Sequence, residues 1–185
     1  MGTREAVRPG GRSARVQESV HQAVRALSAR LGREELTVPQ VAAQAGVTPS
    51  TIYRRWGDMQ ALLADVALER MQPDGAPADT GTLRTDLEAW TQQYLEELSS
   101  TPGRTMLHDV LAASDGTGPA CQCSGITLGQ LHVLVHRAEA RGEPTPTAVQ
   151  LLDRIVAPIV YRVLFGDGSL AMPDSRALVQ AALQP

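Results

Sequence analysis

The segment that decides the fold runs from Leu36 to Leu63 and reads LTVPQVAAQAGVTPSTIYRRWGDMQALL. Its beginning, TVPQ from Thr37, has the T-x-x-Q form of a capping box, with a proline in the first helical turn, where a missing N–H costs little. Gly46 is expected to end this first helix, because glycine adopts the left-handed cap conformation without a Cβ penalty. Two short helices joined by a glycine turn and followed by a third are typical of a helix-turn-helix, which places one helix in the DNA major groove.

The second helix of this motif is expected from about Pro49 to Trp56, with Thr48 as its N-cap. Ile52 and Trp56 lie four residues apart and are expected to face inward. The remaining side chains offer hydroxyl, phenol and guanidinium groups that can bond phosphates or base edges. They are Ser50, Thr51, Tyr53, Arg54 and Arg55. An ordinary helical hairpin with a solvated polar face is the alternative, but the order of caps, turn glycine and Y-R-R-W favours DNA binding.

The order L-T-V-x-x-V-A-x-x-A-G-V-T-x-S-T-I-Y-R-R-W resembles the DNA-binding domain of TetR-family transcriptional regulators. The resemblance covers about residues 12–70 and implies an all-α protein: a three-helix DNA-binding domain, then a larger helical domain that dimerises and holds a small-molecule effector. Carried over by position, it implies DNA contacts from Thr37, Thr48, Ser50, Thr51, Tyr53 and Arg54, with Arg55 as an auxiliary contact.

One position departs from the family pattern. Where the family usually has a phosphate-binding lysine at the start of the fourth helix, this chain has Met59, preceded by Asp58. Asp58 can cap the helix but cannot replace an ammonium group. The departure keeps open an alternative in which the protein is an interaction module with weakened DNA binding.

The charge of the chain is divided between its two ends. The 185 residues carry a net charge of −3, which by itself gives no sign of DNA binding. Residues 1–57 hold nine arginines and four glutamates, a net charge of +5, whereas residues 58–185 hold eight arginines and sixteen acidic residues, a net charge of −8. A basic N-terminal module on an acidic body is expected when only one end of the molecule meets DNA.

These patterns divide the chain into four parts. We expect a flexible basic arm at residues 1–11, a helix-turn-helix DNA-binding domain at 12–58, a connecting helix at 59–71, and an effector-binding and dimerisation domain at 82–185. The intervening segment, QPDGAPADTG, is rich in Pro, Gly and Asp and marks the boundary. The arm could follow the DNA backbone or enter the minor groove, or it could be a solvated tail.

Composition excludes several other classes of protein. Apolar residues make up 43% of the chain but form no run long enough to span a bilayer, and the polar, basic N-terminus lacks the hydrophobic core of a secretory signal. We therefore expect a cytoplasmic protein without a membrane partner. An enzyme is not expected, because His108 and Asp109 accompany no nucleophile motif, phosphate loop or metal-protease pattern. No cofactor is expected either.

Apolar stripes predict the helices of the body. They are expected at about residues 82–100, 104–113, 126–141, 147–165 and 174–183, with a loop or broken helix at 114–125. The helix at 147–165 is expected to kink at Pro158.

The last third of the chain is interpreted as a dimer interface, because the second half of the helix at 147–165 is apolar nearly all round. An internal core helix is the alternative. The interface residues expected are Ile155, Ile159, Val160, Val163, Leu178, Val179 and Ala182. A two-fold dimer would set its recognition helices about 34–36 Å apart, one turn of DNA, and predicts a near-palindromic operator.

Two further hypotheses concern small ligands. Residues expected to line an effector pocket are Trp90, Tyr94, Met106, His108, Leu131 and Tyr161, although residues at such spacing more often belong simply to the core. Residues that could instead form a metal or thiol sensor are Cys121, Cys123, His132 and His136, of which the cysteines are more simply free thiols and the histidines surface groups. The sequence as a whole predicts a dimeric repressor whose effector shifts the spacing between its recognition helices and releases double-stranded DNA.

Overall fold

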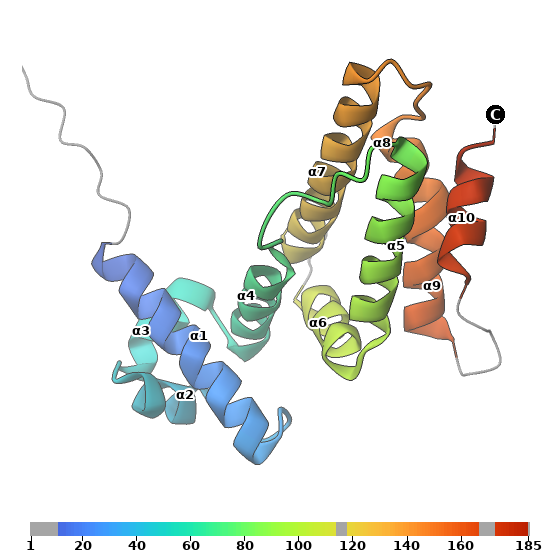
Figure 1. The fold of residues 1–185 in the computed structure, drawn as a ribbon. Coiled ribbons are helices and arrows are strands. Elements are labelled where there is room, and N and C mark those ends of the chain that lie inside the picture. The colour runs from blue at the N-terminus through green and yellow to red at the C-terminus, as the bar shows by residue number, and fades with distance from the viewer. Residues whose placement is uncertain (1–10, 114–117, 167–172, 185) are drawn as a thin grey trace, which may run out of the picture. The chain divides into compact units, whose positions relative to one another are not determined.

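The structure is a computed structural model that describes residues 11–113, 118–166 and 173–184. In these residues the secondary structure is helical and includes no strand, as the sequence predicts (Figure 1). The chain divides into two compact units at Val66 and Ala67, within the fourth helix. The predicted basic arm at residues 1–11 lies, apart from its last residue, outside the described part of the chain.

The first unit contains α1 (Arg12–Leu31), α2 (Val38–Ala45), α3 (Pro49–Trp56) and the first part of α4 (Met59–Met71). Apolar residues at three- and four-residue steps along α1 form a stripe that packs against the other helices. The core of this unit consists of Val20, Ala23, Val24, Leu27, Leu36, Val38, Val41, Ala42, Ile52, Leu62 and Leu63.

The turn between α2 and α3 forms as its sequence predicts. The side-chain oxygen of Gln40 accepts hydrogen bonds from both the N–H and the hydroxyl of Thr37, each over 2.8 Å, and so caps α2. Gly46 then adopts a φ of 68°, the left-handed conformation that favours glycine. Because Ile52 is fully buried, the inner face of α3 is fixed against the core.

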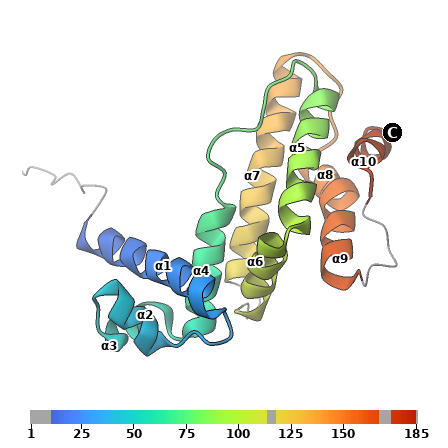
Figure 2. The same ribbon diagram turned by 60° about the horizontal axis from the view of Figure 1, so that its bottom comes forward.

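The second unit contains α5 (Leu83–Ser99), α6 (Thr101–Ala112), α7 (Pro119–Ala140), α8 (Ala148–Leu151), a π-helical segment η1 (Leu152–Val156), α9 (Ala157–Phe165) and α10 (Ser175–Ala182). Within this unit α5 lies between α7 on one side and α9 and α10 on the other (Figures 1 and 2). The core side chains come from all these helices and include Leu87, Trp90, Leu107, Leu131, Leu134, Leu151, Ile155, Ile159, Val163 and Val179.

Two predicted helix starts are corrected. The helix expected at about 104–113 begins three residues earlier, at Thr101: the Ser100 hydroxyl accepts from the N–H of Gly103 over 3.0 Å, and Pro102 occupies the first turn. Likewise the helix expected at about 126–141 begins earlier, at Pro119, so that residues 119–125 of the predicted loop or broken helix are helical. In both helices a proline lies in the first turn, where its missing N–H costs little.

The helix expected at 147–165 changes its hydrogen-bond pattern before Pro158, and its expected kink at Pro158 stays a prediction. Its middle part, η1, is π-helical, and the Ala157 N–H donates to the carbonyl of Leu152, five residues back. Pro158 has no N–H to donate to the carbonyl of Arg154, so an α-helical bond is missing at this point. The π-helical turn lies directly before the proline, as a single turn inside a longer helix.

Candidate nucleic-acid interface and ligand pocket

The outer face of α3 is polar and open. Tyr53 is 51% exposed, and Ser50 and Arg54 are exposed beside it. At the start of the helix the Thr48 hydroxyl oxygen lies 2.9 Å from those of Ser50 and Thr51, so three hydroxyl groups form one cluster. This face combines small donors and acceptors with a phenol and a guanidinium, the groups that bond phosphates and base edges.

The two arginines of α3 have different surroundings. Arg54 is exposed and forms no hydrogen bond or ion pair with the described residues, which leaves its guanidinium available. Arg55 instead donates to the carbonyl and hydroxyl oxygens of Ser13, over 3.0 and 2.7 Å, and to the side-chain oxygen of Gln17. The predicted auxiliary role of Arg55 on DNA therefore competes with a bracing role between α3 and α1.

The start of α4 has Met59 at the position where the family usually has a phosphate-binding lysine. Asp58 caps the helix by accepting from the Ala61 N–H over 2.8 Å. Met59 is half-buried and packs against the core of the first unit. An apolar side chain at this position contributes to packing and offers no cation to a phosphate.

Two family models match the chain. That of bacterial regulatory proteins of the tetR family matches residues 21–66, the helix-turn-helix region just described. That of the tetracyclin repressor-like C-terminal domain matches residues 77–182, more than half of the chain. The chain belongs to the TetR family of transcriptional regulators. It is thus a DNA-binding, helix-turn-helix regulator of transcription rather than an enzyme.

Two curated relatives of this chain are described as HTH-type transcriptional regulators. The HTH-type transcriptional regulator AqdR of Rhodococcus erythropolis is 32% identical over 105 residues, which cover 56% of this chain and 50% of AqdR. The HTH-type transcriptional regulator Mb1581 of Mycobacterium bovis is 25% identical over 170 residues, 83% of this chain and 79% of that one. The match to AqdR thus spans only half of that regulator's length.

A solved structure extends the similarity to the whole fold. The TetR-family transcription regulator SCO0332 has a TM-score of 0.69 and 26% sequence identity, and the match covers 92% of this chain and 99% of that one. Among the described helices of this TetR-family chain, none is both long enough and apolar enough to cross a membrane.

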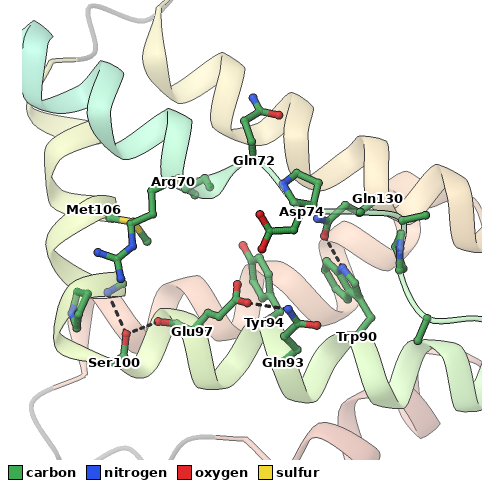
Figure 3. A pocket seen from close by; sticks show the side chains of 18 residues that line it. Arg70, Gln72, Asp74, Trp90, Gln93, Tyr94, Glu97, Ser100, Met106 and Gln130 are labelled. Atoms are coloured by element: carbon green, nitrogen blue, oxygen red, sulfur yellow. Dashed lines mark hydrogen bonds between the residues drawn. The ribbon is translucent and has the colours of Figure 1, made fainter. Parts of the chain in front are cut away.

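The second unit contains a cavity of about 400 Å³ between the linker that follows α4 and the helices α5, α6 and α7 (Figure 3). Trp90 and Tyr94 stack in its wall, with ring centroids 4.9 Å apart and planes inclined by 18°. The Trp90 indole N–H donates to the side-chain oxygen of Gln130 over 2.5 Å. Asp74 and Glu97 add carboxylates and Arg70 a guanidinium, so the cavity combines an aromatic wall with charged groups.

Three of the six predicted pocket residues line this cavity: Trp90, Tyr94 and Met106. The other three predicted residues do not line this cavity. His108 faces solvent, Leu131 is fully buried in the core, and Tyr161 is exposed on α9. Apolar spacing along a helix identifies the residues that turn inward, but not whether they meet a cavity or other side chains. Burial raises the pKa of Tyr94 far above its ordinary range, so the phenol stays protonated.

Two arginines hold the linker that forms one wall of the cavity: Arg137 at the end of α7 and Arg141 in the turn that follows. The sequence did not predict this role for either of them. Arg137 donates to the carbonyl of Pro77 over 2.6 Å. Arg141 pairs with Asp86 over 3.0 Å, with Asp79 over 3.1 Å and with Glu143 over 2.6 Å. The only signal in the sequence is a pair of arginines four residues apart, whose partners in the linker and at Asp86 lie 55 to 62 residues earlier.

Asp86 is the buried end of this network. Burial alone would raise the pKa of its carboxyl, but hydrogen bonds from Thr80 and Arg141 outweigh it and hold the pKa below its ordinary value. The carboxylate is therefore ionised at neutral pH, where it holds the linker against α5 and the turn after α7. Its contribution to stability is present above the pKa of the unfolded state and is lost as the pH falls through the lower folded pKa.

The metal or thiol hypothesis is not supported. Cys123 and His132 both lie on α7, where nine residues correspond to about 13 Å along the helix axis. Cys121 and His136 on the same helix lie farther apart still, so one ion cannot bind both ends of the set. Within the described residues no group of three or more His, Cys, Asp or Glu side chains is placed to hold a metal ion.

Most residues predicted for the dimer interface lie in the core of the single chain. Those that are at most 4% exposed are Ile155, Ile159, Val163, Val179 and Ala182. Their prediction as contact residues is corrected, since a partner would have to displace the chain's own core to reach them. Val160 and Leu178 are half-buried and stay available. The exposed apolar groups of α9 are Tyr161 and Phe165, 59% and 68% exposed, with ring centroids 5.2 Å apart.

Proposed function

We propose that this TetR-family regulator is a cytoplasmic homodimeric repressor that binds a near-palindromic operator and is released by a small-molecule effector. The observation that carries the proposal is the outer face of α3, where Ser50, Tyr53 and Arg54 are exposed over a fully buried Ile52. A recognition helix needs this combination, because its inner face must hold it rigidly while its outer face meets the groove. Thr37, Thr48, Thr51 and Arg55 complete the proposed contact set.

Selection of duplexes from a random library with the full-length protein tests the DNA-binding role. We expect the selected sequences to contain two inverted half-sites whose centres are about one helical turn of DNA apart, because each subunit of a two-fold dimer reads one half. Affinity should fall steeply with salt, as phosphate contacts require. If no sequence is enriched over the starting library, the proposal fails and an interaction module without DNA recognition takes its place.

We place the dimer contact on the exposed aromatic face of α9, together with the half-buried Val160 and Leu178. Tyr161 and Phe165 lie on this face within one turn of each other, and aromatic side chains exposed to this degree commonly mark an interface. The apolar circumference of the helix, which suggested an interface from the sequence, is thus divided between an inner face toward the core and an outer face toward a second copy.

Phe165→Asp is expected to shift the protein from dimer to monomer at micromolar concentration, because a carboxylate would be buried without a partner in the interface. Size-exclusion chromatography with light scattering measures the change. Leu111→Asp is the matched control, since Leu111 is also an exposed apolar residue but lies on α6. A wild-type monomer, or a Phe165→Asp dimer as stable as the control, would contradict this interface.

The effector is proposed to bind in the cavity lined by Trp90, Tyr94 and Met106. The cavity is of ordinary size for a small-molecule site, and its aromatic wall with a few charged groups is typical of one. The linker that forms one wall of the cavity follows directly from α4. Because the first part of α4 belongs to the DNA-binding unit, a ligand that contacts the linker would act on that unit through α4. Compounds that release the selected duplex should lose that effect in a Met106→Trp variant, whose larger side chain fills the cavity.

A further inference from the structure

One carboxylate oxygen in the first unit joins three helices. Trp56, the last residue of α3, donates its indole N–H to Asp65 Oδ2 over 2.7 Å. From α1, His21 Nε2 donates to the same oxygen over 3.0 Å and Gln17 Nε2 over 3.3 Å. Because Asp65 lies on α4, the end of the recognition helix is bonded to the connecting helix and, through the same oxygen, to α1.

Arg55 closes this network into a ring. Its guanidinium donates to the side-chain oxygen of Gln17, whose amide nitrogen in turn donates to Asp65. The same guanidinium lies 5.1 Å from the ring centroid of Trp56, within the range of a cation–π contact. The last two residues of α3 are therefore both held to Asp65, one directly and the other through Gln17.

Asp65 does not fill the core. Its side chain is 35% exposed, whereas Leu62 and Leu63 on the same helix are buried among the core residues of this unit. Apolar contacts hold α4 in place but are non-directional. Hydrogen bonds have preferred lengths and angles, and those to an ionised group are shorter and stronger than neutral ones. The bonds of Asp65 are thus suited to fixing direction rather than to supplying bulk stability.

The charge needed for these bonds is present at neutral pH. The hydrogen bond from His21 holds the pKa of Asp65 below its ordinary value, against the opposing effect of burial, and the bond from Trp56 and the nearby charge of Arg55 act in the same sense. The carboxylate accepts from all its donors in this state.

We propose that Asp65 is a positioning residue for DNA recognition, which fixes the orientation of α3 through its bond to Trp56. This inference rests on the proposed DNA-binding role of α3. It assigns Asp65 no contact with DNA: the contacts are made by the outer face of the helix, and Asp65 determines how that face is presented. Since α4 continues beyond Val66 into the second unit, Asp65 is also the polar link through which a displacement of α4 would reach the recognition helix.

The test uses the full-length protein and the duplex that the wild type selects from the random library. Asp65→Ala removes the acceptor, and Trp56→Phe removes the donor while keeping an aromatic ring. Each single variant is expected to lose roughly tenfold in affinity for the selected duplex, the size of effect expected for one hydrogen bond to a charged group. Both changes break the same bond, so their effects should not multiply. The affinity of the double variant should be at most about twofold lower than that of the single variant that binds less tightly.

A second readout separates positioning from loss of folding. A scrambled duplex at low salt is bound mainly through its phosphates, so its affinity for Asp65→Ala should stay within about twofold of wild type. A protein that merely unfolds would lose affinity for both duplexes alike. Asp65→Asn keeps the side chain's size and one oxygen that can accept from Trp56. It is expected to retain more affinity for the selected duplex than the alanine variant. If the alanine variant does not fold, the affinities of Asp65→Asn for the selected and the scrambled duplex are measured in its place.

Asp58→Asn is the matched control, because it removes one negative charge from the cap of the same helix and asparagine still caps. It should bind the selected duplex at least as well as wild type. The proposal is overturned if Asp65→Ala binds that duplex within twofold of wild type, if the losses of Asp65→Ala and Trp56→Phe multiply, or if the control loses as much as Asp65→Ala. If the wild type selects no duplex, the proposed DNA-binding role itself has failed.

Discussion

Arg54→Ala is expected to weaken binding to the selected duplex by about 2 kcal/mol, or roughly thirtyfold, which is within the range for one arginine contact to a base edge. The guanidinium of Arg54 is exposed and forms no bond with the described residues, so its removal should leave the fold unchanged. Fluorescence anisotropy with labelled duplexes, at one fixed salt concentration, measures the loss. The scrambled duplex should show a much smaller loss if Arg54 reads a base, and an equal loss if it meets only phosphate.

Arg25→Ala is the control for charge. Arg25 is an exposed arginine of the same unit and lies on α1, where it pairs with Glu18 over 3.2 Å. Its removal changes the net charge by the same amount and should cost no more than about threefold, since exposed charges act on DNA mainly through a screened field. If Arg54→Ala binds the selected duplex as well as Arg25→Ala does, α3 is not the recognition helix in the way proposed.

Ile155→Ala is expected to lower the free energy of unfolding by about 2–5 kcal/mol, the range for a large-to-small change in a packed core. Ile155 is fully buried in the core of the second unit, within the π-helical segment η1. The cost has two parts: apolar surface is lost from the core, and a cavity is left that the surrounding helices fill only partly. Urea unfolding followed by circular dichroism measures the change in midpoint.

Val149→Ala is the matched control on the neighbouring helix α8. Val149 is 57% exposed, so its truncation should change the unfolding free energy by no more than about 0.5 kcal/mol. The dimer affinity of the Ile155→Ala variant distinguishes a core residue from an interface residue. If Ile155 belonged to the interface, its truncation would weaken the dimer while leaving the unfolding of the monomer almost unchanged. That result would restore the interpretation of Ile155 that the sequence suggested.

The N-terminal part of the fold could be predicted closely from sequence, because its signals are local. The capping residues, Gly46 and the inward pair of Ile52 and Trp56 all act within one or two helical turns, so their order along the chain already specifies α2, the turn and α3. Helix boundaries were harder to predict. The segment TPG at residues 101–103 could either end a helix or start one, and the Gly, Ser and Cys content of residues 119–125 did not indicate the helix that begins at Pro119.

The candidate sites were predicted less completely, for a different reason. Arg54 and Arg55 are neighbours of the same chemical type, but only Arg55 finds Ser13 and Gln17 within reach. Trp90 and Leu131 both belong to apolar stripes, but only Trp90 borders the cavity. Which member of such a pair is free depends on residues brought close by packing rather than on spacing along the chain.

The sequence by itself therefore indicated the TetR family, through the resemblance of its helix-turn-helix motif, and predicted the all-α fold, since the helices of that fold depend on caps, turns and apolar periodicity between near neighbours. Only the tertiary structure decided which apolar residues of α9 and α10 belong to the core, which charges tie the linker to α7, and that Asp65 joins α1, α3 and α4. Each of these depends on contacts between residues far apart in the chain, such as His21 with Asp65 or Asp86 with Arg141. Periodicity can say that a side chain turns inward, but only packing determines what it meets there.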